Sequence, residues 1–159
     1  MSRKTKKIIT QNDMSSGASK IKALLDAGAD VNTRFEEGVT PLMSASVRGN
    51  VAMIEVLLKA GADLELQQDY EGMTALMKAA LWKKTKVAVK LISAGAQVNK
   101  ATQHGWTALM YAALAGDSQT IQELLKAGAD TKIKDNWDKI ALHYAQEKEH
   151  TEAITLLNR

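Results

Sequence analysis

The stretch "LLKAGAD" at residues 57–63 occurs again, letter for letter, at residues 124–130. Two variants of it, "LLDAGAD" at 24–30 and "LISAGAQ" at 91–97, complete a series whose first glycines are spaced by 33, 34 and 33 residues. A fixed period of this length is typical of a solenoid, in which each unit buries its apolar face against its neighbours. The repeat therefore predicts a single elongated domain over residues 1–159.

A second motif runs in phase with the first: "TPLM" at 40–43, "TALM" at 74–77 and 107–110, and "IALH" at 140–143. The threonine of this motif fits the N-cap of a helix. Glycines such as Gly49 and Gly61 fit the left-handed turn that ends a helix. Apolar residues spaced by three and four, such as Ile54, Leu57 and Leu58, predict a second helix in each unit. Each unit therefore has the pattern helix–turn–helix–loop.

These linked motifs resemble the ankyrin-repeat family, because "G-x-T-[PA]-L-M-x-A" starts at Gly38, Gly72 and Gly105 and four "AGA[DQ]" endings follow in phase. The resemblance covers residues 18–159. It implies an all-α repeat solenoid, a curved stack of helix–turn–helix units with short β-hairpin or loop fingers, and binding of another protein on the concave side. In this register, full repeats span 38–71, 72–104 and 105–137, between a degenerate N-terminal cap unit (1–37) and a truncated C-terminal cap unit (138–159).

The chain departs from the family pattern in its histidines. The histidine that follows "TPL" in the family is Met43, Met77 and Met110 here and returns only as His143. In the family this histidine ties loops together by hydrogen bonds, so we expect these units to use apolar packing in its place.

Three further departures concern local structure. The first unit lacks the threonine cap and most of the small residues of the repeat, and we expect a weak or frayed start. Lys83 and Lys84 replace the Gly-Asn of residues 49–50 and the Gly-Asp of 116–117. One of these lysines is therefore strained into a left-handed turn, or the turn has changed shape. His150 is expected to replace the glycine that ends the first helix of the last unit.

The aromatic residues fall outside the columns that define the repeat, which hold Leu, Ile, Ala and Met. In families of this kind the other columns form the fingers and the inner helix face, which contact partners, and Tyr and Trp are enriched where binding energy concentrates. The alternative is that these aromatic residues pack locally against neighbouring units. The predicted partner-binding residues are Tyr70, Lys78, Leu81, Trp82, Trp106, Tyr111, Leu114, Trp137 and Tyr144.

Charge is distributed unevenly, although the net charge is only +3. Residues 72–104 carry six lysines and no acidic residue, whereas the units on both sides carry a net negative charge. A local field of this kind would steer an acidic partner. For Lys86 and Lys90, on the outer helix, simple solvation is the favoured alternative. Nucleic acid is the less favoured partner, because the basic region is limited to one unit.

Several functions are disfavoured. The absence of Cys removes disulfide and thiolate chemistry and fits a reducing compartment. No apolar run has the length of a signal peptide or a membrane span, so a cytoplasmic protein is expected. There is no phosphate-binding glycine loop or nucleophile elbow, and His104, His143 and His150 do not stand at metal-ligand spacing with acidic residues. The sequence therefore predicts a monomeric, non-catalytic module with no cofactor that binds a protein partner, or alternatively a dedicated regulator that masks one enzyme or effector.

Overall fold

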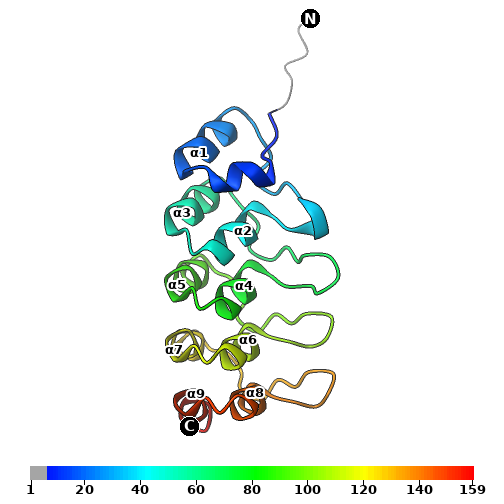
Figure 1. The fold of residues 1–159 in the computed structure, drawn as a ribbon, viewed down its shortest axis with the longest axis vertical. Coiled ribbons are helices and arrows are strands. Elements are labelled where there is room, and N and C mark those ends of the chain that lie inside the picture. The colour runs from blue at the N-terminus through cyan, green and yellow to red at the C-terminus, as the bar shows by residue number, and fades with distance from the viewer. Residues whose placement is uncertain (1–6) are drawn as a thin grey trace, which may run out of the picture.

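The structure is a computed structural model that describes residues 7–159. Residues 1–6 of the predicted N-terminal unit lie outside the described residues. The helices stand in two parallel columns with a third column of loops, the fingers, beside them (Figure 1). The inner column, next to the fingers, holds the 3-10 helix η1 (Gln11–Ser15), α2 (Pro41–Arg48), α4 (Ala75–Leu81), α6 (Ala108–Ala115) and α8 (Ala141–Glu147). The outer column holds α1 (Ala18–Asp26), α3 (Val51–Lys59), α5 (Thr85–Ser93), α7 (Ser118–Lys126) and α9 (Thr151–Leu157).

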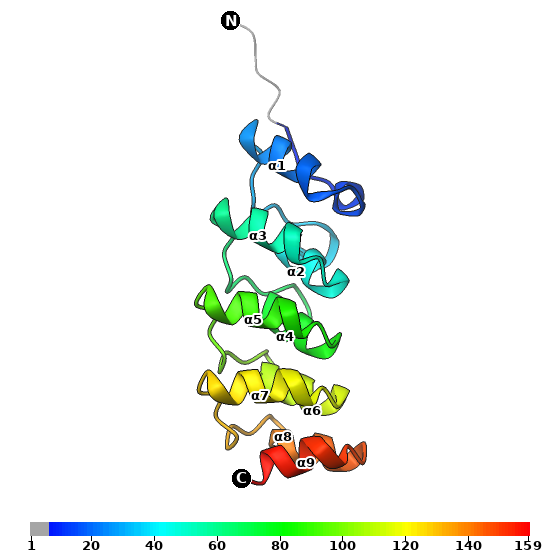
Figure 2. The ribbon, with the colours of Figure 1, turned by 90° about the vertical axis from the view of Figure 1, so that its left-hand side faces the viewer.

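Each helix packs against its partner in the same unit and against the equivalent helix of the next unit, as the side view shows (Figure 2). The residues of the repeat columns form the core. For example, Ala79 and Ala112 of the inner column and Leu57, Leu91 and Leu124 of the outer column are all fully buried. This arrangement confirms the predicted all-α repeat solenoid. No helix in the described part of the chain is both long and apolar enough to cross a membrane.

The fingers are loops rather than β-hairpins. Among residues 7–159 the only β pairing is an isolated bridge between Ala101 and Thr107. Each finger is closed by a single backbone hydrogen bond across its neck, such as Thr102 N–H to the Trp106 carbonyl at 2.9 Å. A single bond does not make a ladder, so the fingers take the loop form of the predicted hairpin or loop fingers. A second 3-10 helix, η2 (Glu36–Gly38), forms the tip of the first finger.

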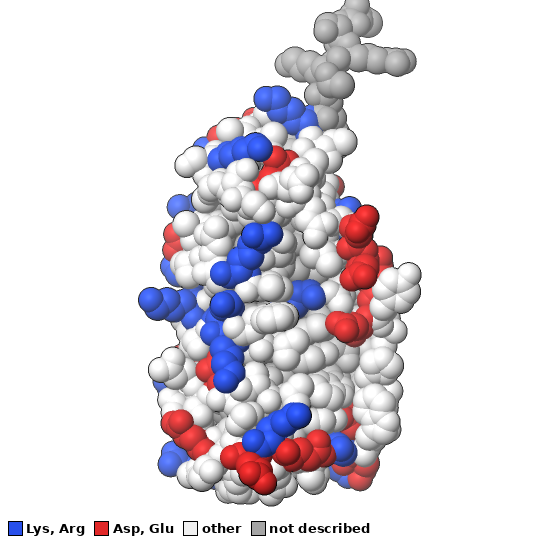
Figure 3. All heavy atoms as spheres, viewed as in Figure 1, with Lys and Arg blue, Asp and Glu red and all other residues white. Residues whose placement is uncertain are grey.

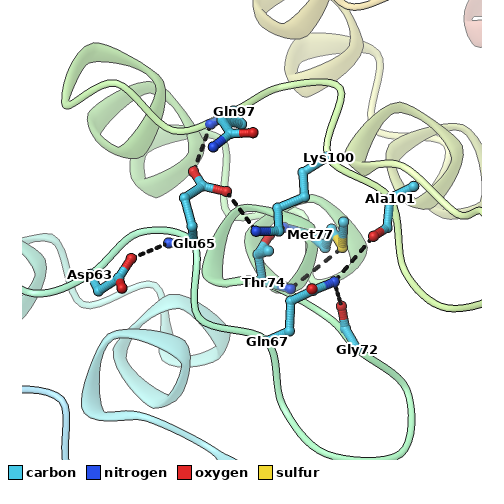
Figure 4. Close-up of polar contacts among 9 residues, drawn as sticks. All are labelled: Asp63, Glu65, Gln67, Gly72, Thr74, Met77, Gln97, Lys100 and Ala101. Atoms are coloured by element: carbon cyan, nitrogen blue, oxygen red, sulfur yellow. Dashed lines mark hydrogen bonds and ion pairs between the residues drawn. The ribbon is translucent and has the colours of Figure 1, made fainter.

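The threonine motif caps the inner helices as predicted. The Oγ1 atoms of Thr40, Thr74 and Thr107 accept the N–H three residues later, at 3.3, 3.4 and 3.4 Å. Met77 does more than pack, because its Sδ accepts the N–H of Thr74 at 3.4 Å (Figure 4).

In the last unit His143 Nδ1 accepts the equivalent N–H of Ile140 at 3.0 Å. The methionine of the third unit therefore keeps, as a weak acceptor, part of the polar contact that we expected to be lost.

Polar contacts also tie one finger to the next. Gln67 Nε2 donates to the carbonyl of Gly72 at 2.6 Å and to that of Ala101, on the following finger, at 3.1 Å (Figure 4). Glu65 accepts the N–H of Gln97 at 2.8 Å and pairs with Lys100 at 3.5 Å. These bonds fix neighbouring loops relative to each other.

The first unit is better ordered than its sequence suggests. Thr10 caps η1 by a capping box with Asp13, and Ile9, Met14 and Ile21 are buried. Thr10 lies three residues after the position that the repeat register assigns to the threonine, which is Lys7. The cap was not predicted because the helix has contracted to one 3-10 turn. A weak or frayed start of the chain stays a prediction.

The turn between α4 and α5 keeps its shape without glycine. Lys83 has a φ of 53°, close to the 70° and 67° of the equivalent Gly49 and Gly116, which confirms that a lysine is held in the left-handed region. Lys84 occupies the N-cap of α5 but makes no side-chain cap. In the last unit Glu149 takes the left-handed position at 55°, and His150 takes the N-cap position of α9. The prediction that His150 replaces the helix-ending glycine is therefore wrong by one residue, because Glu149 takes that position.

Candidate functional site

An open hollow of about 380 Å³ lies between the fingers and the inner helices α4 and α6, and its lining residues come from the second, third and fourth units. We call it the inner hollow. Five of the nine predicted site residues line it: Leu81, Trp106, Tyr111, Leu114 and Trp137. Leu81 is the last residue of α4, and Tyr111 and Leu114 lie on α6, whereas the two tryptophans come from fingers. The remaining lining residues are Glu71, Thr102 and His104.

Thr102 fixes the finger that carries Trp106. Its side chain is buried, and its Oγ1 accepts the N–H of His104 at 3.3 Å and of Trp106 at 3.1 Å. The Trp106 ring then lies against Tyr111, with 5.0 Å between ring centroids and an angle of 51° between the planes. Two aromatic walls of the hollow are thus positioned by local hydrogen bonding and stacking.

Glu71 supplies the only acidic side chain in the lining. Its Oε2 accepts a hydrogen bond from Gln68 Nε2 at 2.8 Å, which orients the carboxylate. Burial raises the pKa of Tyr111 to about 12, and the negative charge of Glu71 contributes to the rise. The Glu71 carboxylate therefore acts electrostatically on the aromatic wall.

Trp137 is the most exposed part of the inner hollow's aromatic lining. Its side chain is 61% exposed, and its ring lies 5.7 Å from the His104 ring of the preceding finger. The Asp135 Oδ1 atom accepts the Trp137 N–H at 2.9 Å, which fixes the finger backbone.

Tyr144 does not lie on this surface, contrary to the prediction. It is only 6% exposed, its ring lies 4.2 Å from that of Trp106, and its hydroxyl donates to Asp135 Oδ2. The Tyr144 side chain thus packs against Trp106 and bonds a buried carboxylate, so it supports the aromatic wall of the hollow without lining it. Burial raises the pKa of the Asp135 carboxyl, but hydrogen bonds from Tyr144 and from the backbone of Lys139 and Trp137 outweigh burial and leave that pKa below its ordinary value.

Besides Tyr144, three more predicted residues lie outside the inner hollow. Trp82, the C-cap residue of α4, is 55% exposed, and Tyr70, at a finger tip, is 80% exposed. Lys78 is half-buried, and burial lowers its pKa while the charges of Glu71 and Glu37 oppose that effect. The aromatic residues thus form one hollow and two separate exposed positions, rather than one continuous surface.

Sequence reasoning missed Glu71, Thr102 and His104. Glu71 and His104 share a finger column with Glu37 and Trp137, because each residue directly precedes the leading position of its unit. The signal was therefore available in the register, but only the tryptophan of that column stood out by residue type.

The lysines of the third unit gather elsewhere. Lys83, Lys84 and Lys86 line a second hollow of about 290 Å³ at the start of α5, and Figure 3 shows basic side chains over the helix side of this face and acidic ones on the upper fingers. In the described part of the chain, none of these three lysines forms an ion pair. Lys90 pairs with Glu55 at 2.6 Å, so it does not belong to the free basic surface.

A larger hollow, of about 560 Å³, lies on the outer helices. Val51, Thr85, Lys86, Val89, Lys90, Gln119, Gln122 and Glu123 line it. It holds no aromatic side chain and mixes both signs of charge, so we place the candidate site at the inner hollow.

The stacked helix pairs of the structure agree with the family that the chain matches in sequence. A family model described as "Ankyrin repeats (3 copies)" matches residues 13–102 and 83–158. The chain belongs to the ankyrin-repeat family. Ankyrin repeats are in general protein–protein interaction modules without catalytic activity.

Curated ankyrin-repeat proteins match parts of the chain. The protein named "Ankyrin repeat, SAM and basic leucine zipper domain-containing protein 1" from Atelerix albiventris is 42% identical over 64 residues, which is 40% of this chain and 13% of that protein. "Ankyrin repeat and SAM domain-containing protein 6" from Mus musculus is 35% identical over 68 residues, 43% of this chain and 8% of that protein. "Mitochondrial disaggregase" from Bos taurus is 43% identical over 54 residues, 34% of this chain and 8% of that protein. The chain thus matches only a small part of each relative's length.

Among residues 7–159, no group of three or more acidic, His or Cys side chains is arranged to hold a metal ion.

Proposed function

We propose that this ankyrin-repeat chain binds a protein partner through the inner hollow, with Trp82 and Tyr70 as further contacts. The observation that carries the proposal is the convergence of Leu81, Trp106, Tyr111, Leu114 and Trp137 around one open hollow. Aromatic side chains in a partly enclosed apolar site are the usual centres of binding energy at protein interfaces.

Preorganisation supports the same proposal. The walls of the hollow are fixed before any partner arrives, by Thr102 beneath Trp106 and by Tyr144 and Asp135 behind it. Finger-to-finger bonds, such as Asn136 N–H to the His104 carbonyl at 3.0 Å, hold adjacent loops together. A surface that does not need to be ordered on binding loses less conformational entropy, which favours affinity from a modest area.

The test compares variants of the hollow with a variant outside it. Trp137→Ala and Tyr111→Ala, each as a bait for proteins captured from the native lysate, should reduce the captured species several-fold. Val89→Ala, an exposed apolar change on the outer helix α5, should leave capture unchanged. Equal capture by the wild type and these three variants would exclude the inner hollow as the binding surface, provided that circular dichroism shows each variant folded.

The number of captured species separates two versions of this function. A single dominant species in stoichiometric amount would favour a dedicated regulator that masks one enzyme or effector. Several species that compete for the hollow would favour a general interaction module. Either version places a monomeric chain with its partner in the cytoplasm.

The unpaired lysines at the start of α5 favour a second contact, with an acidic region of the partner. Next to the exposed Trp82, Lys83, Lys84 and Lys86 present three positive charges that form no ion pair in the part of the chain that the structure describes. If these lysines contribute to binding, the affinity should decrease moderately as the salt concentration is raised, because salt screens the attraction between two oppositely charged protein surfaces. A binding constant whose logarithm falls steeply with the logarithm of the salt concentration would instead indicate the alternative partner, nucleic acid.

A further inference from the structure

The inner hollow combines aromatic rings with a single negative charge. Trp106, Tyr111 and Trp137 contribute rings and Glu71 contributes a carboxylate, and among residues 7–159 no Lys or Arg lines the space. The faces of aromatic rings attract cations, because the ring quadrupole places negative charge there. The lining therefore offers both interactions that favour a positively charged group.

The surrounding charges strengthen this preference. Glu37 lies in the same finger column as Glu71, and both carboxylates act on the half-buried Lys78 of α4. Lys78 is half-buried, is not among the residues that line the hollow, and makes no ion pair among the described residues. It balances part of the acidic charge of the fingers but leaves the opening of the hollow free.

The chain itself shows the same chemistry one unit further on. Lys139 Nζ lies 5.5 Å from the centroid of the Tyr144 ring and 2.6 Å from Glu147 Oε1. In the repeat register Lys139 corresponds to Trp106, and Tyr144 corresponds to Tyr111. The fifth unit thus supplies its own cation between a tyrosine ring and a carboxylate, whereas in the fourth unit the tyrosine and the nearby Glu71 face an open hollow.

We propose that the inner hollow receives a positively charged side chain, best an arginine, from an extended segment of the partner protein. The inference rests on the proposed function and specifies the chemistry of the partner. A flat guanidinium stacks on the rings of the two tryptophans while its N–H groups donate to Glu71, which a compact ammonium does less well. The hollow, at about 380 Å³, is near the small end of ligand sites and suits a single long side chain.

The test uses short peptides as probes. Acetylated and amidated Gly-Gly-Arg-Gly-Gly is titrated against the full chain, next to versions with citrulline, which has the same shape without the charge, and with glutamate. The readout is the NMR signal of the indole N–H groups of Trp106 and Trp137, with Trp82, outside the hollow, as an internal control. We expect the arginine peptide to shift both signals and to bind roughly 5-fold tighter than the citrulline peptide, as a cation–π contact at a partly exposed site implies.

A matched pair of variants tests the carboxylate. Glu71→Gln should remove most of the preference for arginine over citrulline, whereas Glu152→Gln, an equal charge change on the exposed side of α9, should keep it. Equal affinity of the arginine and citrulline peptides, or an unchanged preference in Glu71→Gln, would overturn the inference. If no peptide moves the Trp106 and Trp137 signals although the hollow variants still lose partner capture, the cation site is overturned and the proposed function stands.

Discussion

At the scale of single residues, one backbone position in the turn between paired helices recurs in four units. Gly49 and Gly116 occupy it in two units, and Lys83 and Glu149 occupy it in the others, all with positive φ. A side chain in the left-handed region is disfavoured because its Cβ approaches the following carbonyl oxygen. The turn shape therefore follows from the packing of the two helices, and the residue adapts to it.

Replacing Lys83 by glycine should relieve this strain. The cost of a non-glycine residue in the left-handed region is roughly 1–2 kcal/mol, and the greater freedom of glycine in the unfolded chain offsets part of the gain. We expect Lys83→Gly to raise the free energy of unfolding by about 0.5–1 kcal/mol, measured by urea denaturation. The control is Lys86→Gly, in the first turn of α5, which should lower it. A decrease for both variants would show that the Lys83 side chain stabilises the turn by more than its strain costs.

The hydroxyl of Tyr144 should contribute to stability through Asp135. Its loss in Tyr144→Phe leaves a buried carboxylate with one donor fewer, which should cost about 1.5–3 kcal/mol at neutral pH. The lowered pKa of Asp135 means that its contribution is present above the ordinary carboxyl pKa and is lost as pH falls through the lower, folded-state pKa. The difference between wild type and Tyr144→Phe should therefore narrow at acid pH.

The raised pKa of Tyr144, caused by burial and by Asp135, acts in the opposite direction. Its contribution is complete below the ordinary tyrosine pKa and is lost as pH rises through the folded-state value, so the same difference should also narrow at alkaline pH. Urea denaturation of wild type and Tyr144→Phe at a series of pH values measures this difference in the free energy of unfolding at both the acid and the alkaline end. Tyr70→Phe, at an exposed tyrosine, is the control and should show no such dependence. A difference that stays constant with pH would show that the hydroxyl contributes by packing alone.

At the scale of helices and loops, the sequence predicts those elements whose ends are marked by side chains. Thr40, Thr74 and Thr107 mark the starts of inner helices, and the structure places caps at all three. The start of the first unit was not predictable from the register, because Thr10 caps a 3-10 turn three residues away from the repeat position. The hollow was predictable only in part, since burial of Tyr144 depends on Asp135, a contact between a finger and a helix that no local pattern encodes.

The second helix of the third unit tests whether the core column was assigned correctly. Leu91 of α5 is fully buried, and Leu91→Ala should lower the free energy of unfolding by about 2–5 kcal/mol, because it leaves a cavity between α3, α5 and α7. Val89→Ala, two residues away and 37% exposed, should cost much less. Thermal and urea denaturation measure both changes. Similar losses for the two variants would mean that α5 is rotated relative to the register used here.

At the scale of the whole molecule, the chain is a linear array in which each unit packs only on its neighbours. α5 contacts α3 and α7, but α3 and α7 belong to units that do not pack together. This one-dimensional architecture brings residues of the second, third and fourth units to one hollow and leaves lysines of the third unit at a separate hollow. Function in such an array depends on the relative placement of adjacent units, which the finger contacts fix.

Nearest-neighbour packing predicts which core substitutions influence each other. Leu57, Leu91 and Leu124 occupy equivalent buried positions on α3, α5 and α7. The losses caused by Leu57→Ala and Leu124→Ala should add to within about 0.5 kcal/mol, because α5 stands between their helices and packs on both. Leu91→Ala combined with either one should deviate from additivity by more than that, because the cavities share a wall and relax together. Urea denaturation of the single and double variants gives both coupling energies. A larger coupling between Leu57 and Leu124 than between neighbours would mean that strain spreads along the whole stack, and the five units would then have to be treated as one cooperative core.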